Sequence, residues 1–208
     1  MKRLPVAVSA LLVAAFTAFG CAQMESMYDS AAGWTTLIDG EKGIENFNIV
    51  GTANWRAEGG AIVADKGTGN ANYLVSKKSY KNFQLRAEFW ADHTTNSGIY
   101  IRAQDPVKIT IANAYEVNIY DQAPRPQFGT GSIVNVSPAM PIYKTGGKWN
   151  TYEITANDTH IKTVLNGVET NTMYDSKFPA GPFALQFGNR GKQPGGVIKW
   201  RKVQIKEL

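Results

Sequence analysis

An alternation of apolar and polar residues is the feature that most constrains this sequence. It is clearest in residues 82–91, NFQLRAEFWA, where successive side chains of a β-strand would point to opposite faces. One face would carry Phe83, Leu85, Ala87 and Phe89. The other would carry Gln84, Arg86 and Glu88. This pattern predicts a strand with one buried face.

The same alternation runs through residues 96–121, NSGIYIRAQDPVKITIANAYEVNIYD, where two strand-like runs bracket a loop. The apolar positions that share one face are Ile99, Ile101, Tyr115, Val117 and Ile119. The opposite face would carry Tyr100, Arg102, Glu116, Asn118 and Tyr120. If the apolar set faces the core, a guanidinium, a carboxylate, an amide and two phenols line the outer surface of the sheet. This polar face is the predicted site.

The rest of the chain contains short strand-like segments separated by Gly, Asn, Asp and Pro. Turns are expected near Asn157-Asp158 and at Asn166-Gly167, and a bulge is expected between Trp200 and Val203. The segment SIVNV, residues 132–136, is expected to be a short strand. These features predict an all-β fold, a two-sheet antiparallel sandwich. Periodicity leaves a jelly-roll and an immunoglobulin-like topology open.

The first residues resemble a targeting segment. Lys2 and Arg3 precede an uncharged apolar stretch, so residues 1–20 are expected to be a signal peptide. Cys21, the single cysteine in the sequence, follows small residues as in the lipobox of bacterial lipoproteins. We therefore expect Cys21 to be lipidated. Simple secretion is the alternative, because small residues also suit ordinary signal peptidase.

Domain boundaries and location follow from this segment. Residues 21–32 are expected to be the lipidated Cys and a flexible tether, and residues 33–208 a single β-sandwich domain. Ala22 replaces the Asp that commonly retains lipoproteins in the inner membrane. We therefore expect an exported outer-membrane lipoprotein facing the periplasm or the cell surface, held to the membrane by the lipid anchor alone.

The charge pattern gives no support for a nucleic-acid partner. The formal net charge is +5, and the Lys and Arg residues are dispersed apart from a cluster near the C-terminus. A dispersed excess of this size is typical of a solvated surface. The sequence leaves the oligomeric state open.

Several kinds of catalytic site lack support in this sequence. The two histidines, His93 and His160, are far apart and form no zinc-binding spacing. The sequence contains no G-x-S-x-G motif and no P-loop. His160 is expected on the surface, whereas His93 lies close to the predicted polar face. No cofactor is predicted with certainty, and a divalent metal remains possible.

Ordinary glycosidases use two carboxylates, and the sequence offers no suitable pair. Glu116 and Asp121 are five positions apart on one strand, so their side chains would point to opposite faces. The E-x-D-x-x-E strand motif of laminarinase-like sandwiches would need Asp at Asn118. Glu116 and Arg102 could also form a purely structural cross-strand ion pair.

A set of motifs resembles one bacterial family. In order along the chain they are W-x-x-L-I-D-G, NSGIYIR, YEVNIYD, TGSI, GKWNTYEI, LNG, GPFALQF and IKWRKVQIKEL. The set is similar to the 3-keto-disaccharide hydrolase family over residues 33–208. The resemblance implies a concanavalin A-like jelly roll whose concave face takes a small carbohydrate.

The resemblance also implies an activity, cleavage of the glycosidic bond of a 3-keto-glycoside or a related disaccharide. A keto group at C3 makes the C2 proton acidic, so that one general base can start elimination of the group at C1. Glu116 would be the base, and Arg102 would stabilise negative oxygen. Substrate-binding residues would be Asn96, Tyr100, Asn118, Tyr120, Gln186 and His93. The loop of residues 122–131 would set specificity.

Three positions depart from the family's pattern. Asn118 stands for a usual Gln, Val134 stands for an aromatic residue, and Gly188 stands where a His is common. The departures keep two alternatives open. One is a carbohydrate-binding protein without activity that uses Tyr100, Tyr120 and Trp90 for stacking on sugar rings. The other is a structural envelope lipoprotein.

Overall fold

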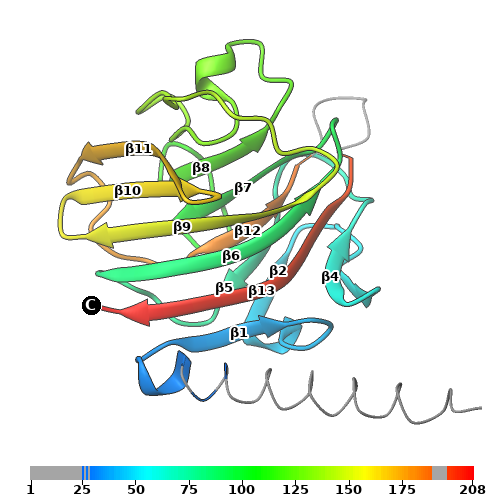
Figure 1. Cartoon of the computed structure of the whole chain (residues 1–208). Helices are drawn as coiled ribbons and strands as arrows, with labels where there is room; N and C mark the ends of the chain where they lie inside the picture. Colours follow the sequence, from blue (N-terminus) through cyan, green and yellow to red (C-terminus); the bar gives the residue numbers. More distant parts are fainter. Residues whose placement is uncertain (1–24, 26, 28, 189–195) are drawn as a thin grey trace, which may run out of the picture. The chain divides into compact units, whose positions relative to one another are not determined.

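The computed structural model describes residues 25, 27, 29–188 and 196–208, and the expected signal peptide and Cys21 lie outside them. Within the described residues, thirteen strands form two antiparallel sheets (Figure 1). The predicted all-β, two-sheet sandwich is therefore confirmed. The short 3-10 turns are η1 (Ile44–Asn46) and η2 (Pro126–Phe128).

The two sheets have the following strand orders. The larger sheet runs β11 (Val168–Tyr174), β10 (His160–Leu165), β9 (Trp149–Asn157), β6 (Phe83–Ala91), β13 (Ile198–Glu207), β4 (Ala61–Ala64) and β3 (Arg56–Glu58), with β1 (Thr35–Asp39) also paired to β13. The smaller sheet runs β2 (Phe47–Val50), β5 (Asn72–Ser76), β12 (Ala184–Phe187), β7 (Asn96–Ile101) and β8 (Tyr115–Tyr120).

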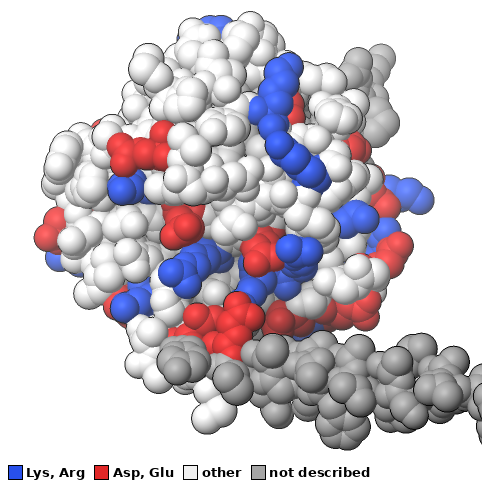
Figure 2. All heavy atoms as spheres, viewed as in Figure 1, with Lys and Arg blue, Asp and Glu red and all other residues white. Residues whose placement is uncertain are grey.

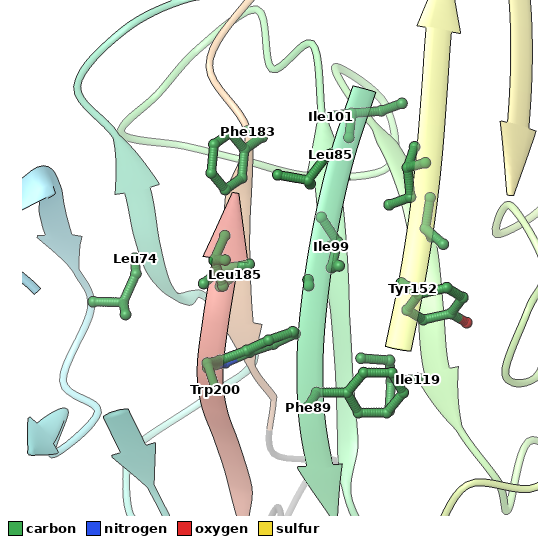
Figure 3. Close-up of a cluster of buried hydrophobic side chains, with 14 of the residues drawn as sticks. Leu74, Leu85, Phe89, Ile99, Ile101, Ile119, Tyr152, Phe183, Leu185 and Trp200 are labelled. Carbon is green, nitrogen blue, oxygen red and sulfur yellow. The ribbon is translucent and has the colours of Figure 1, made fainter. Parts of the chain in front are cut away.

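The core lies between the inner faces of the two sheets (Figure 3). Strand β6 alternates between buried and half-buried residues along its whole length, so the predicted face assignment of residues 83–89 is confirmed. Phe89 stacks on Tyr152 of β9 with ring centroids 5.3 Å apart, and Trp200 of β13 lies on its other side at 5.9 Å. Ile99 and Ile119 of the smaller sheet belong to the same buried cluster.

The predicted irregularities also occur in the structure. The register between β13 and β6 shifts between Trp200 and Lys202, which is the expected bulge. Asp158, Asn166 and Gly167 all have positive φ in the two turns that join β9, β10 and β11. The expected strand at residues 132–136 is wrong, because Ile133 forms isolated bridges with Val117 and Ser137 and no continuous ladder.

The outer face of the larger sheet carries interspersed charges (Figure 2). Lys162 and Glu169 are 3.2 Å apart, and Arg201 pairs with Glu88. Exposed pairs of this kind contribute little to stability, typically below about 1 kcal/mol each. Trp90 lies on this face of β6, where the Lys199 ammonium is 4.9 Å from its ring centroid. The expected place of Trp90 among the sugar-stacking aromatics of the polar face is therefore wrong.

The sequence predicts a flexible tether in the segment before the first strand. Residues 25, 27 and 29–31 are helical. The helix ends in a Schellman motif, in which Trp34 N–H donates to Asp29 O (2.9 Å) and Gly33 N–H donates to Ser30 O (3.0 Å). Gly33 has φ 83°, a conformation that glycine adopts without steric cost. Among the described residues, no helix is long and apolar enough to cross a membrane.

Candidate functional site

A pocket of about 560 Å³ opens on the outer face of the smaller sheet. This size is within the range of small-molecule sites. Strand residues that line it are Tyr73, Asn96, Tyr100, Glu116, Asn118, Tyr120 and Gln186. Loop residues that line it are Asn70, Ala71, Ile109, Thr110, Ile111, Ala123, Pro124, Arg125, Phe128, Val134 and Asn135. The structure thus brings together six predicted site residues, which are Asn96, Tyr100, Glu116, Asn118, Tyr120 and Gln186.

Strand register explains why these side chains meet. Ile99 and Val117 face the core, so the alternate residues of β7 and β8 face outward. Tyr100 pairs with Glu116, and Gly98 pairs with Asn118. A Cβ at Gly98 would lie 3.1 Å from Glu116 Cγ and 3.1 Å from its Oε1. Because Gly98 has no side chain, the Glu116 side chain can lie over β7 in the pocket floor.

Glu116 belongs to a buried hydrogen-bonded group. Its side chain is 8% exposed, and its carboxylate is hydrogen-bonded to the Tyr100 hydroxyl. Tyr73 and Tyr100 pack edge to face with centroids 5.3 Å apart, and the Tyr73 hydroxyl donates to Ile109 O (3.1 Å). Burial, and then the nearby Glu116 charge, raises the pKa of Tyr100 far above its usual value. Tyr100 therefore stays protonated and remains a hydrogen-bond donor at neutral pH.

Two amide side chains form the polar part of the pocket wall. Asn118 Nδ2 donates to Phe128 O (2.8 Å), and Gln186 Nε2 donates to Asn70 O (3.1 Å). The remaining oxygens, Asn118 Oδ1 and Gln186 Oε1, are buried acceptors with no hydrogen-bond partner in the described part of the chain. Buried acceptors are normally satisfied by protein, water or ligand, so this wall can accept from the hydroxyl groups of a bound molecule.

Asn96 and Gly188 lie side by side at the far end of this polar part. Gly188 N–H donates to Asn96 O (2.9 Å), which forms an isolated bridge between the two segments. A Cβ at Gly188 would be 2.9 Å from Asn96 Nδ2. A larger residue at position 188 would therefore displace Asn96, and the glycine at this position is compatible with the pocket as it stands.

The loop of residues 122–131 covers one side of the pocket and lies beyond β8 (Figure 1). The Arg125 guanidinium lies 4.6 Å from the Phe128 ring centroid and donates to Asn135 Oδ1 (3.0 Å). Asp121 anchors the start of the loop, because it accepts from Thr130 Oγ1 (2.7 Å) and from the N–H groups of Thr145 and Gly146 (2.8 Å each). Arg125 is the one positively charged side chain among the described lining residues.

Arg102 does not lie where the alternation predicts. Strand β7 ends at Ile101, and Arg102 has φ 54°, which turns its side chain away from the pocket. Its guanidinium is fully buried and donates to Lys81 O (2.6 and 3.0 Å) and Asp158 O (2.7 Å). The predicted face for Arg102 is therefore wrong, as is the cross-strand ion pair with Glu116. Arg102 ties three loops together, since it also reaches Phe178 O (3.4 Å).

His93 also lies outside the described lining of the pocket. It is exposed, and its ring packs against Gly146, where a Cβ would be 2.5 Å from Nδ1. The sequence placed it near the site because it precedes Asn96 by three residues. The turn between β6 and β7 carries it instead to the loop that Asp121 holds.

The described residues give limited support for a bound metal. They contain no group of three or more His, Cys, Asp or Glu side chains that could hold an ion. The pocket offers one carboxylate, Glu116, and the two amide oxygens of Asn118 and Gln186. Hard cations such as Ca²⁺ take six to eight oxygen ligands, often from several carboxylates, so this set does not fit a resident divalent metal well.

Sequence reasoning missed Tyr73, Asn70 and Arg125 as site residues. Tyr73 lies on β5, which reaches the pocket only because β12 lies between it and β7. The short apolar run in NYLVS, residues 72–76, marks a strand but does not indicate its neighbours. The sequence signal that could have identified Arg125 is its place in the loop of residues 122–131, which was predicted to set specificity.

The fold and the pocket define the class of the protein. Its two sheets form a jelly-roll sandwich of the galectin and concanavalin A type, with a polar pocket on one sheet. A provisionally assigned glycosyl hydrolase from Parabacteroides distasonis ATCC 8503 is 25% identical, with a TM-score of 0.66, covering 84% of this chain and 99% of that chain. A second one from the same organism is 20% identical with a TM-score of 0.72, covering 87% and 96%.

A carbohydrate-binding module shares the fold as well. The carbohydrate-binding module CBM66 from Bacillus subtilis is 18% identical with a TM-score of 0.52, covering 84% of this chain and 96% of that chain. No curated protein gives a significant match. The model of the 3-keto-alpha-glucoside-1,2-lyase-like domain matches residues 33–206, and the chain belongs to this family.

Proposed function

We propose that this protein binds a 3-keto-glycoside in the pocket and cleaves its glycosidic bond by elimination, with Glu116 as the base. The observation that carries the proposal is that Glu116 is the one carboxylate among the described lining residues. A two-carboxylate glycosidase mechanism needs a second such group, whereas elimination next to a ketone needs one base. Family membership supports the same substrate class.

The proposed reaction balances with the residues of the pocket. Glu116 removes the proton from C2 of the sugar, and the electron pair of that bond forms an enolate with the C3 carbonyl. The enolate then forms a C1–C2 double bond as the C1–O bond breaks. The aglycone leaves as an alcohol after it takes up a proton from Glu116 or from water. Water can later add to the unsaturated ketone, which would make the net reaction a hydrolysis.

The neighbours of Glu116 have consistent roles in this proposal. The Tyr100 hydroxyl is hydrogen-bonded to Glu116 and can hold the carboxylate in position. The free oxygens of Asn118 and Gln186 would accept from sugar hydroxyls. Asn96 and Tyr120 lie at the same end of the pocket, where the register pairs them. Arg102 has no part in the reaction, because its buried guanidinium is bound to loop carbonyls.

Carbohydrate binding without cleavage is the second candidate function. It is favoured by the likeness to a carbohydrate-binding module and by a pocket lined by aromatic side chains packed edge to face and by amides. It would use the same residues, with Glu116 accepting from sugar hydroxyls. A purely structural role is less well supported, because the buried acceptors of Asn118 and Gln186 have no structural partner in the described chain.

The test is incubation of the purified protein with a 3-keto-glucoside that carries a chromogenic aglycone. We expect release of the aglycone, and a fall of about 100-fold or more in kcat for Glu116→Gln, which is the usual contribution of a general base. Glu153→Gln is the matched control, because Glu153 is an exposed carboxylate on the outer face of the larger sheet and lies outside the described lining. Saturable binding with no release would favour the second candidate, and neither binding nor release would contradict both.

We also propose that the protein is an exported lipoprotein with its lipid on Cys21. The support is the sequence of residues 1–21 alone. Metabolic labelling of cells with a palmitate analogue should mark the wild-type protein and not Cys21→Ala. Labelling that is equal in both would contradict the proposal.

A further inference from the structure

The pocket has two chemically different parts on either side of Glu116. Asn118 and Tyr120, which follow Glu116 along β8, lie at one end of the pocket together with Asn96 and Gln186. The other end of β8 leads to Tyr115 and the loop of residues 102–114. The lining at that end includes three apolar side chains, Ile109, Ile111 and Val134, together with Thr110 and Asn135.

Val134 lies directly beside Glu116. Its N–H donates to Glu116 O (2.9 Å), and Ile133 bridges Val117, so this segment runs along the open edge of β8. Ile133 is fully buried in the core. Val134 is half-buried and belongs to the lining of the pocket.

Ile109 and Ile111 come from the loop that joins β7 to β8. Ile109 is buried in a small apolar cluster with Tyr73 and Tyr100, and its carbonyl accepts from the Tyr73 hydroxyl (3.1 Å). This contact holds the loop against the pocket floor. Ile111 lies two residues further on and keeps 41% of its surface exposed in the pocket lining. An exposed isoleucine in the lining of a pocket can bury its side chain against an apolar ligand.

We propose that the substrate is a glycoside with an apolar aglycone, an alkyl or aryl group, which packs against Ile109, Ile111 and Val134. The inference rests on the proposed function, because it needs the scissile bond to lie above Glu116. Glu116 acts on C2 of the sugar, and the neighbouring ring atom, C1, carries the aglycone. With the sugar ring at the amides of Asn118 and Gln186, the aglycone falls in the apolar part.

A second sugar in the apolar part would bind poorly. Hydroxyl groups that lie against Ile109, Ile111 and Val134 would leave water without new partners, and an unpaired buried hydroxyl is costly. An alkyl or aryl group has no such cost and gains from the apolar surface it buries. The pocket therefore discriminates between a glycoside with an apolar aglycone and a disaccharide.

The test compares the methyl, benzyl and glucosyl 3-keto-glucosides, in both anomeric forms, by kcat/KM. Methanol and benzyl alcohol are leaving groups of similar acidity, so a difference between these two reports contact with the aglycone. We expect the benzyl compound to be preferred over the methyl compound and over the glucosyl compound by about tenfold or more, as burial of a ring predicts.

Variants locate the contact. In Ile111→Ser and Val134→Ser the ratio of benzyl to methyl kcat/KM should fall toward one. Val107→Ser is the matched control, because Val107 is on the same loop, is 74% exposed and is outside the described lining, so the ratio should keep its wild-type value. A ratio near one in the wild type, or a preference for the glucosyl compound, would overturn the inference and leave the proposed function intact.

If none of the three compounds is cleaved, the proposed function fails, and calorimetry with the same compounds decides the inference separately. Binding of the benzyl compound about tenfold more tightly than the methyl compound, with loss of that difference in Ile111→Ser, would support an apolar subsite. Equal affinity would overturn it.

Discussion

The Glu116 side chain occupies the space that a side chain at Gly98 would need. Oε1 and Cγ of Glu116 would each be 3.1 Å from a Cβ at Gly98, and the Val117 carbonyl oxygen would also be 3.1 Å away. The absence of a side chain on one strand thus sets where the carboxylate of the next strand can lie. Gly98, which is not among the described lining residues, therefore positions the proposed base.

Gly98→Ala should reduce catalysis while the protein stays folded. Its backbone conformation is extended, so alanine adds contact and no backbone strain, and the added methyl group displaces the Glu116 carboxylate. We expect kcat to fall by about tenfold, since small misplacements of a catalytic group are costly. Gly67→Ala is the control, because it crowds Ala53 at 3.1 Å outside the pocket. An unchanged kcat for Gly98→Ala would contradict the positioning role.

Arg102→Met should destabilise the fold and leave the affinity of the folded protein for its ligand unchanged. The substitution removes the donors for three buried or half-buried carbonyl groups, those of Lys81, Asp158 and Phe178. Loss of a buried charged donor of this kind costs about 3 kcal/mol of unfolding free energy. Urea unfolding gives the stability, and titration with ligand below the unfolding midpoint gives the affinity. A loss of affinity without a loss of stability would restore a direct role for Arg102.

Arg125→Ala should show the opposite pattern. The guanidinium is exposed, so its removal should change the unfolding free energy by less than about 0.5 kcal/mol. It lies over Phe128 and donates to Asn135 in the pocket lining, so ligand binding should weaken by about threefold to tenfold. Arg86→Ala, on the outer face of the larger sheet, serves as the control. Equal binding by Arg125→Ala and wild type would exclude the loop as a contributor to affinity.

Tyr115 makes the stability of the folded protein depend on pH in the alkaline range. Burial, and then its hydrogen bond to Asp175, raises the pKa of Tyr115 to about 12, above the value of about 10 for an unfolded tyrosine. The folded state favours the protonated phenol, so this stabilisation is complete below about pH 10 and is lost as pH rises toward 12. Urea unfolding between pH 9 and 12 should therefore show a steeper loss of stability for the wild type than for Tyr115→Phe. Parallel curves would contradict this linkage.

Some features of the site follow from local sequence. The alternation in residues 96–121 was sufficient to predict which side chains of β7 and β8 face outward, because the period of a strand is fixed by its backbone. Glu116, Asn118 and Tyr120 were therefore predicted correctly as neighbours on one face. The same argument was wrong for Arg102, because the strand ends one residue earlier and a positive φ reverses the direction of the side chain.

The sequence by itself determined the all-β class, the strand faces, the turn at Asn166-Gly167 and the bulge in β13, since each depends on residues close together in the chain. Tertiary structure alone decided that β5 and β12 lie beside β7, which brings Tyr73 and Gln186 to Glu116. It also decided that Ile111, Arg125 and Val134 enclose the pocket. Strand order and loop packing depend on burial across the whole domain, and the period of a single segment carries no information about its partners.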